Sequence, residues 1–250
     1  MIKYPEPGRV KTRLAKEIGN RRAAEIYRQL AVQILKQTDP VSFRRHPVQC
    51  PTLKKGGWGD LNENSLCREI SPTPSLPTVG RTEPPKRGIS ENCSRGETTP
   101  VAYRRIVLYD PPERLHDFEL WLPGNQFIPQ HGDDVGERMD NAIRELLACG
   151  AEKAVLTGAD IPDLSAEIIV KAFAALDQAD IVIGPAADGG YYLIGMKKPH
   201  SEIFQGIPWS TERVFETTVC RIRKLQLSYI STITLSDIDR LEDLKHFRSH

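Results

Sequence analysis

The stretch AVLTGADIPDLSAEIIVKAFAALDQADIVIG (residues 154–184) predicts a strand, a helix and a second strand in direct succession. Ala154–Thr157 and Ile181–Gly184 are short apolar runs, which is typical of buried strands. Ser165 can accept a hydrogen bond from the first turn of a helix over Ala166–Leu176, as N-cap residues do. This order of elements favours a parallel sheet whose faces are covered by helices.

The same alternation continues on both sides of this stretch. Towards the N-terminus, apolar residues recur at steps of three and four after Asn20, which can cap a helix that ends near Gln37. The other predicted elements are a strand at Ile106–Tyr109, a helix at Arg138–Cys149, a strand at Tyr191–Met196, a helix at Thr211–Leu225, a strand at Tyr229–Leu235 and a helix at Ile238–Phe247. We therefore expect an α/β fold with one mostly parallel sheet flanked by helices.

Residues 40–100 differ in composition from the rest of the chain. They contain nine of the 19 prolines, and their few apolar residues follow neither the helical nor the strand period. Such a segment buries too little apolar surface to offset its chain entropy. We expect a long disordered insertion in a single domain made of residues 1–39 and 101–250. The alternative is a structured lid over a binding site.

The bulk composition argues against several classes of protein. The chain has 34 basic and 33 acidic residues, which gives no sign of nucleic-acid or membrane-surface binding. It has no apolar run long enough to span a membrane, and its first residues lack a signal-peptide core, so we expect a cytoplasmic protein. The five cysteines show no CxxC spacing and indicate neither a zinc site nor a disulfide framework. Nothing in the sequence indicates the oligomeric state.

The loop PEPGRVKTRL (residues 5–14) has the composition of an anion-binding turn. Pro7 and Gly8 predict a rigid turn in which backbone N–H groups can approach a phosphate closely. Lys11 and Arg13 add positive charge, and an arginine can bind two phosphate oxygens at once. The alternative is an ordinary surface loop with solvated cations.

Asp160 follows the predicted strand Ala154–Thr157. Ligands of open α/β sheets bind at the carboxyl ends of strands, and a carboxylate there can hold Mg²⁺ or Mn²⁺ against phosphate oxygens. The alternative is a helix cap, a role that Asp163 or Ser165 fits better than Asp160 does.

Two further carboxylates, Asp237 and Asp239, follow the predicted strand Tyr229–Leu235. If the chain stays extended, their side chains point in similar directions. The alternative is that Asp239 caps the last helix.

Asp188 precedes Gly189 and Gly190 after the predicted strand Ile181–Gly184. The two glycines leave space for a substrate, and the carboxylate can accept a proton from an acceptor hydroxyl, which makes Asp188 the candidate catalytic residue. A tight Asp-Gly turn between strands explains the same residues.

Two other positions have both a binding and a packing interpretation. Gly136 lies near the start of a predicted helix, where free N–H groups suit a nucleotide, although helix capping by Asp133 or Asp134 explains the segment equally well. Trp209 can stack on an acceptor sugar or pack in the core.

Six segments together resemble the rSAM/selenodomain-associated transferase family, also described as arsenosugar-biosynthesis glycosyltransferases, within the nucleotide-diphospho-sugar transferase superfamily. They are PEPGRVKTRL (5–14), GDDVGERM (132–139), TGADIPDLS (157–165), GPAADGGYYLIGM (184–196), IPWST (207–211) and SDIDRLEDL (236–244). The resemblance implies a GT-A (Rossmann-like) fold, a metal at Asp160 completed by Asp239, and a first strand that is shortened here to Met1–Tyr4.

The function that follows is a metal-dependent glycosyltransferase, which transfers a sugar from a nucleotide-activated donor to a small acceptor. The first alternative is a nucleotidyltransferase on the same fold, which joins an NTP to a phosphorylated acceptor. The second alternative is a degenerate, non-catalytic copy. The sequence identifies neither the sugar, the nucleotide and the acceptor nor the stereochemical outcome.

Overall fold

The computed structural model describes residues 1–40 and 103–244. The expected insertion at residues 40–100 lies almost wholly outside this range. The strands are β1 (Ile2–Lys3), β2 (Ile106–Asp110), β3 (Gln126–Pro129), β4 (Ala154–Thr157), β5 (Ile181–Pro185), β6 (Tyr191–Met196) and β7 (Tyr229–Ser231). The α-helices are α1 (Thr12–Ile18), α2 (Asn20–Gln37), α4 (Leu115–Trp121), α5 (Val135–Ala148), α6 (Ala166–Ala175) and α7 (Val214–Lys224), and the 3₁₀ turns are η1 (Pro112–Arg114) and η2 (Ser201–Phe204).

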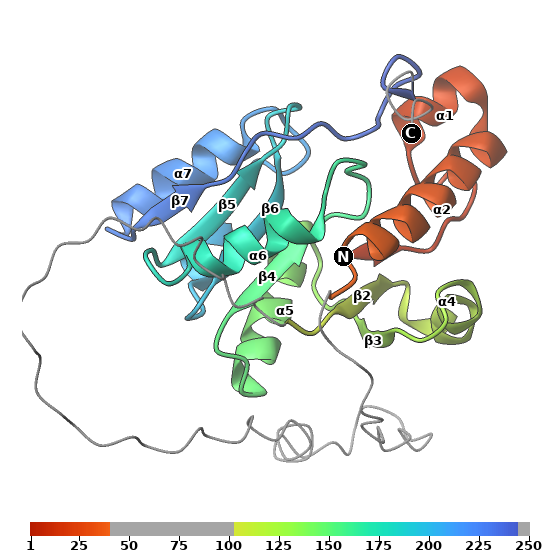
Figure 1. Cartoon of the computed structure of the whole chain (residues 1–250). Helices are drawn as coiled ribbons and strands as arrows, with labels where there is room; N and C mark the ends of the chain where they lie inside the picture. The colour runs from red at the N-terminus through yellow and green to blue at the C-terminus, as the bar shows by residue number, and fades with distance from the viewer. Residues whose placement is uncertain (41–102, 245–250) are drawn as a thin grey trace, which may run out of the picture.

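The strands form two sheets rather than the one expected. The first has the order β1-β2-β3 and is parallel throughout, and the second has the order β4-β6-β5-β7. In the second sheet β6 is antiparallel to both β4 and β5, whereas β7 is parallel to β5. The predicted α/β class with mostly parallel pairing is confirmed. Figure 1 shows the first sheet with α1, α2 and α4 at one end of the molecule, and β7 with α7 at the other.

The two sheets meet at the short strand β1, and we call this boundary the seam. Ile2 and Lys3 pair with the end of β2, while the backbone nitrogen of Met1 donates to the carbonyl oxygen of Thr157 at 2.7 Å. Within residues 1–40 and 103–244, no strand pairing joins β4 to the first sheet. The facing edges of β2 and β4 line a cavity of about 110 Å³. The cavity therefore lies where the two sheets face each other.

Helices bury the faces of both sheets. The buried side of α2 is mostly apolar, and it packs with Val107 and Tyr109 of β2. Buried residues of α6 pack on Val182 and Leu193 of the second sheet. Helix α5 packs on the strands through its buried residues Met139 and Ile143. These contacts fix the ends of the strands, where the polar motifs lie.

The C-terminal segment returns to the N-terminal helices. Ile238 and Leu244 are buried against Leu14 of α1 and Leu30 of α2. Figure 1 shows this blue segment crossing from the second sheet to α1. Apolar packing on either side of Asp239 therefore brings that carboxylate next to the loop that precedes α1.

Several predicted boundaries need correction. Helix α5 begins at Val135 rather than Arg138, because the side chain of Asp134 accepts from the N–H of Glu137 and so caps it three residues earlier. Strand β7 ends at Ser231 rather than Leu235, and the predicted helix does not begin at Ile238: Ile238 and Asp239 are irregular, Arg240 is a bend, residues 241–243 form a turn, and Leu244 is helical. The rest of that predicted helix, 245–247, lies outside the described residues.

The sequence pattern also missed some elements. Helix α1 begins inside the loop that was predicted over Pro5–Arg13, and both β3 and α4 were not predicted. None of the described helices combines the length and apolarity that crossing a membrane requires.

Candidate active site

The loop before α1 opens with a tight turn. The N–H of Arg9 donates to the carbonyl of Glu6 at 3.0 Å, Pro7 occupies the second turn position, and Gly8 the third with φ +84°. This is the pattern of a type II turn, in which the third position favours glycine. The turn directs the following residues, Arg9 to Arg13, towards the carboxyl ends of β1 and β4.

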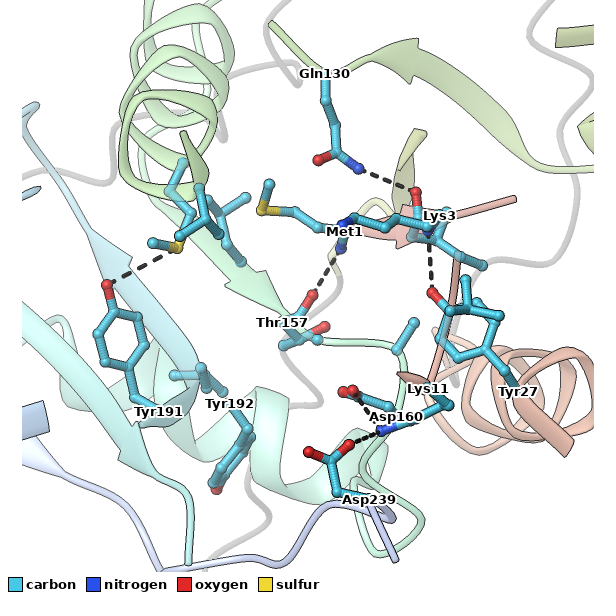
Figure 2. Close-up of a pocket in the computed structure, with 18 of the residues that line it drawn as sticks. Met1, Lys3, Lys11, Tyr27, Gln130, Thr157, Asp160, Tyr191, Tyr192 and Asp239 are labelled. Atoms are coloured by element: carbon cyan, nitrogen blue, oxygen red, sulfur yellow. Dashed lines mark hydrogen bonds and ion pairs between the residues drawn. The ribbon is translucent and has the colours of Figure 1, made fainter. Parts of the chain in front are cut away.

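Lys11 lies between two carboxylates that come from distant parts of the chain. Its Nζ donates to Asp160 Oδ2 at 2.9 Å and to Asp239 Oδ1 at 3.0 Å. Arg13 Nη1 donates to the other oxygen of Asp239 at 3.1 Å. Figure 2 shows the two aspartates converging on the lysine. The structure therefore brings together four of the residues that were predicted to bind phosphate or metal.

The Lys11 side chain is only 4% exposed, compared with 36% for Asp160 and 27% for Asp239. Burial alone lowers the pKa of Lys11, but the charges and hydrogen bonds of the two aspartates outweigh burial and raise the pKa above its usual value. The pKa of Asp239 is lowered, since its contacts with Lys11 and Arg13 overcome the opposite effect of burial. Lys11 and Asp239 are therefore both charged at neutral pH.

Asp237 lies beside this cluster without a lysine partner. Burial raises its pKa to about 6, and the negative charge of Asp239 adds to this effect. Asp237 lines a different cavity from Lys11. Asp237 and Asp239 thus share the wall of the second cavity, as their predicted similar direction suggested, but only Asp239 also lines the first cavity and contacts Lys11.

A first cavity of about 450 Å³ opens beside the cluster. Its wall includes the loop residues Arg9, Lys11 and Arg13, the end of β4 up to Asp160, and strand β6. Tyrosine, glutamine and methionine side chains that the sequence analysis missed complete the wall: Tyr27, Gln130, Met139, Tyr191 and Tyr192. The cavity combines an apolar interior with cations at one side, as sites for small organic anions do.

Gln130 is the clearest of the missed residues. It is buried, and its amide nitrogen donates to the backbone carbonyls of Ile2 at 3.0 Å and Leu108 at 2.9 Å. These bonds tie β1 to the wall of the first cavity. Gln130 follows β3, a four-residue strand that carries a proline and shows no clear period, so the sequence offered no signal for it.

A second cavity of about 880 Å³ adjoins the first and shares Arg13, Met139, Tyr191 and Asp239 with it. Asp188, Gly190 and Trp209 line this second cavity, and their contact with an acceptor stays a prediction. Its charge is mainly negative: the lining carboxylates are Asp188, Glu212, Asp237, Asp239, Glu242 and Asp243, and the cations are Arg13 and Arg240. The cluster of Lys11, Asp160 and Asp239 therefore lies where the two cavities meet. The first cavity has cations at one side, and the second is mainly acidic.

The loop of Asp188 has the predicted turn geometry as well as a place in the cavity. Asp188 Oδ1 accepts from the N–H of Gly190 at 2.9 Å, and the loop joins the antiparallel strands β5 and β6. Gly189 has φ +88°, and a Cβ atom there would lie 2.0 Å from the carbonyl oxygen of Glu212. The turn interpretation is confirmed, and it leaves the exposed Asp188 side chain at the cavity wall.

Four of the predicted site residues line neither cavity. Pro7 and Gly8 form the turn, Gly189 packs against backbone, and Gly136 is buried under Trp209, whose ring would lie 2.4 Å from a Cβ at that position. Trp209 also meets Tyr191 edge to face, with ring centroids 6.4 Å apart. Pro7, Gly8, Gly136 and Gly189 thus support the cavity walls without lining them. Their direct contact with a ligand stays a prediction.

Comparison with known proteins shows a likeness to a solved structure over almost the whole chain. A crystal structure from Desulfovibrio desulfuricans G20, provisionally described as a nucleotide-diphospho-sugar transferase, is 29% identical and has a TM-score of 0.70, over 99% of this chain and 84% of its own. A protein family described as an uncharacterized protein conserved in bacteria (DUF2064) matches residues 98–211. No curated protein matches. The chain therefore shares the nucleotide-diphospho-sugar transferase-like fold, while its predicted place in the arsenosugar-biosynthesis family stays a prediction.

Two other structures are weakly similar. CMP:2-keto-3-deoxy-manno-octonic acid synthetase in complex with CTP is 11% identical with a TM-score of 0.43, over 61% of this chain and 82% of its own. The bifunctional IspDF from Campylobacter jejuni is 14% identical with a TM-score of 0.40, over 57% of this chain and 41% of its own. Likenesses this weak support no conclusion about this chain.

Proposed function

We propose that this protein is a divalent-metal-dependent glycosyltransferase that uses a nucleotide-diphospho-sugar as donor. The observation that carries the proposal is the cluster of Lys11, Asp160 and Asp239 at the junction of two adjoining cavities. The Desulfovibrio protein, 29% identical across almost the whole chain, supports the donor class through its description. The first cavity would bind the nucleotide, and the second would bind the acceptor.

The residues present fit a divalent cation. Asp160 and Asp239 both place an oxygen within 3.0 Å of one cationic nitrogen, so the two carboxylates already converge on a single positive charge. No group of three or more His, Cys, Asp or Glu side chains suited to a metal occurs within the described ranges. Mg²⁺ is commonly held by one or two carboxylates together with substrate phosphates, and this pair matches that pattern.

Each residue of the site has a role in the proposed transfer. Arg9 and Arg13 line the first cavity and would bind the diphosphate. When bound, the metal would add positive charge to the leaving diphosphate. Asp188 would accept the proton of the acceptor hydroxyl, whose oxygen bonds to the anomeric carbon. The bond from that carbon to the diphosphate breaks, and the nucleoside diphosphate leaves with the electron pair.

The charge of the second cavity favours sugar transfer over nucleotidyl transfer. A nucleotidyltransferase would have to bind a phosphorylated acceptor there, next to six carboxylates and only two arginines. The carboxylates would repel a negatively charged phosphate. A neutral hydroxyl acceptor is not repelled and can donate hydrogen bonds to the carboxylates.

Product analysis tests the proposal. The protein is incubated with Mn²⁺ and either a panel of nucleotide-sugars with hydroxyl acceptors, or NTPs with sugar 1-phosphates. We expect nucleoside diphosphate to be released in the first case and no pyrophosphate in the second. Pyrophosphate release would show the nucleotidyltransferase reaction instead, and no reaction or nucleotide binding under any condition would favour the degenerate copy.

A further inference from the structure

The ammonium group of Lys11 fills the space to which the two metal-binding candidates point. It is almost completely buried and donates to an oxygen of each aspartate at 2.9 and 3.0 Å. Its backbone has φ 46° and ψ 48°, the left-handed conformation that side chains other than glycine, asparagine and aspartate rarely adopt. With this uncommon backbone conformation, the ammonium group of Lys11 lies between the two carboxylates.

A divalent ion bound by both aspartates would have to take the place of this ammonium group, because two cations held at the same pair of oxygens repel each other strongly. The displaced lysine would then be a buried charge without a partner, which is costly. The other charged side chains of the cavity wall, apart from the two aspartates, are the cations Lys3, Arg9 and Arg13, which repel it. An anion in the first cavity would relieve this cost, and the diphosphate of the nucleotide is the anion that the proposed function supplies.

We propose that Lys11 is a built-in competitor of the metal, which leaves the aspartates only when a divalent cation and a nucleoside diphosphate bind together. This inference rests on the proposed function and adds to it an order of events at the site. Metal alone binds weakly, because it must displace the lysine without offering that lysine a new partner. The nucleoside diphosphate offers the partner, so each ligand raises the affinity of the other by the same factor.

Mn²⁺ binding, measured by the electron paramagnetic resonance signal of the free ion, tests this competition without any catalytic readout. We expect Lys11→Met to bind Mn²⁺ alone at least tenfold more tightly than the unchanged protein. Arg13→Met is the matched control. It removes an equal charge that also pairs with Asp239, but Arg13 is 57% exposed and touches only one of the two carboxylates, so its effect should stay within a few-fold.

The outcomes separate the competition from the proposed function. If Lys11→Met and Arg13→Met raise the affinity for Mn²⁺ equally, the competition is overturned. The loss of one positive charge near the site would then explain both effects. If neither variant nor the unchanged protein binds Mn²⁺ at millimolar concentration, with or without ADP, GDP, UDP or CDP, the metal itself is wrong.

A measurement on the unchanged protein avoids the risk that Lys11→Met fails to fold. The ¹⁵N-labelled ammonium of Lys11, protected by its two hydrogen bonds, should give a resolved signal without ligands. It should shift when Mg²⁺ and a nucleoside diphosphate are both added, and stay in place with either alone. A signal that does not respond to both ligands together would contradict the exchange.

Discussion

At the scale of single residues, the site depends on carboxylates whose neighbours give them different properties. Lys11 and Asp239 are 228 positions apart in the sequence, and their contact lowers the pKa of Asp239. Asp237, two residues away, faces no cation closely and has a raised pKa. Asp188 is exposed at the end of a hairpin. The residue type alone therefore does not define the role of an aspartate here.

Asp188→Asn tests the proposed proton acceptor. Asparagine keeps the size of the side chain and an oxygen that can accept from the N–H of Gly190, so the turn should stay intact. It cannot accept the proton of the acceptor hydroxyl, so we expect kcat to fall by about 10²- to 10⁴-fold with little change in donor affinity. Asp163→Asn, at an exposed carboxylate outside both cavities, is the control. Full activity of Asp188→Asn would remove this residue from the mechanism.

Asp237 should make stability depend on pH. Its folded pKa, about 6, lies above the ordinary value of 3.8, so its stabilising contribution is complete below about pH 4 and is lost as the pH rises through 6. Asp237→Asn should therefore raise the free energy of unfolding at pH 7 by on the order of 1 kcal/mol, a value reduced for its partly exposed position, with no gain at pH 4. Urea unfolding in EDTA at both pH values measures this, and an equal effect at both would contradict it.

At the scale of elements, the loops at the carboxyl ends of the strands decide the shape of the site. The β5–β6 loop and the segment before α7 pack backbone against backbone at Gly189, where the N–H of Phe215 also donates to the Gly189 carbonyl at 2.9 Å. This contact fixes the distance between the Asp188 turn and the segment that carries Trp209 and Glu212. Gly189 thus makes a close backbone contact with Glu212, which the adjacent Gly190 does not make.

Gly189→Ala and Gly190→Ala form a matched pair. At Gly189 the positive φ and the 2.0 Å approach to Glu212 leave no room for a Cβ, so we expect a loss of about 2–3 kcal/mol in unfolding free energy and a distorted second cavity. At Gly190 the Cβ would meet only the movable Asp188 carboxylate, at 3.1 Å, and the loss should stay under about 1 kcal/mol. Chemical unfolding of both variants checks the difference, and equal losses would show that the Glu212 contact does not matter.

Sequence reasoning identified most of the longer helices and strands and the main charged motifs, because both leave local signals, but it missed α1, β3 and α4. Ser165 caps α6 as predicted, with its hydroxyl oxygen 3.5 Å from the N–H of Ile168. The pairing of Lys11 with Asp160 and Asp239 joins three separate segments, and only the folded chain shows it. Gln130 could not be predicted either, because its role depends on the carbonyl of Ile2, which is distant in sequence.

At the scale of the whole molecule, the two ends of the segment between the described ranges are held together. Tyr103 Oη donates to the carbonyl of Thr38 at 2.6 Å, and Arg105 pairs with Asp39 at 3.3 Å and also donates to the carbonyl of Leu35. The end of α2 and the start of β2 are therefore fixed to each other by contacts of the described residues alone.

Replacing residues 41–102 by a six-residue Gly/Ser linker should leave a folded protein. The clamped ends need only a short connection, and closing a loop about ten times shorter lowers the entropic cost by roughly 2 kcal/mol if the segment is the unstructured insertion that its composition predicts. We expect unfolding stability equal to or above that of the full chain, and unchanged nucleotide binding, by urea unfolding and calorimetry. A stable variant that has lost nucleotide binding would favour the lid interpretation.

The seam also has a mechanical consequence. It borders a partly open cavity of about 110 Å³ between β2 and β4, and the N-terminal nitrogen of Met1 crosses it by donating to the carbonyl of Thr157. Hydrostatic pressure favours states in which such incompletely packed space is filled. Under compression we expect water to enter the seam and the contacts between the two sheets to loosen. Since Lys11 and Asp160 lie on opposite sides of that boundary, their ion pair would report this loosening directly.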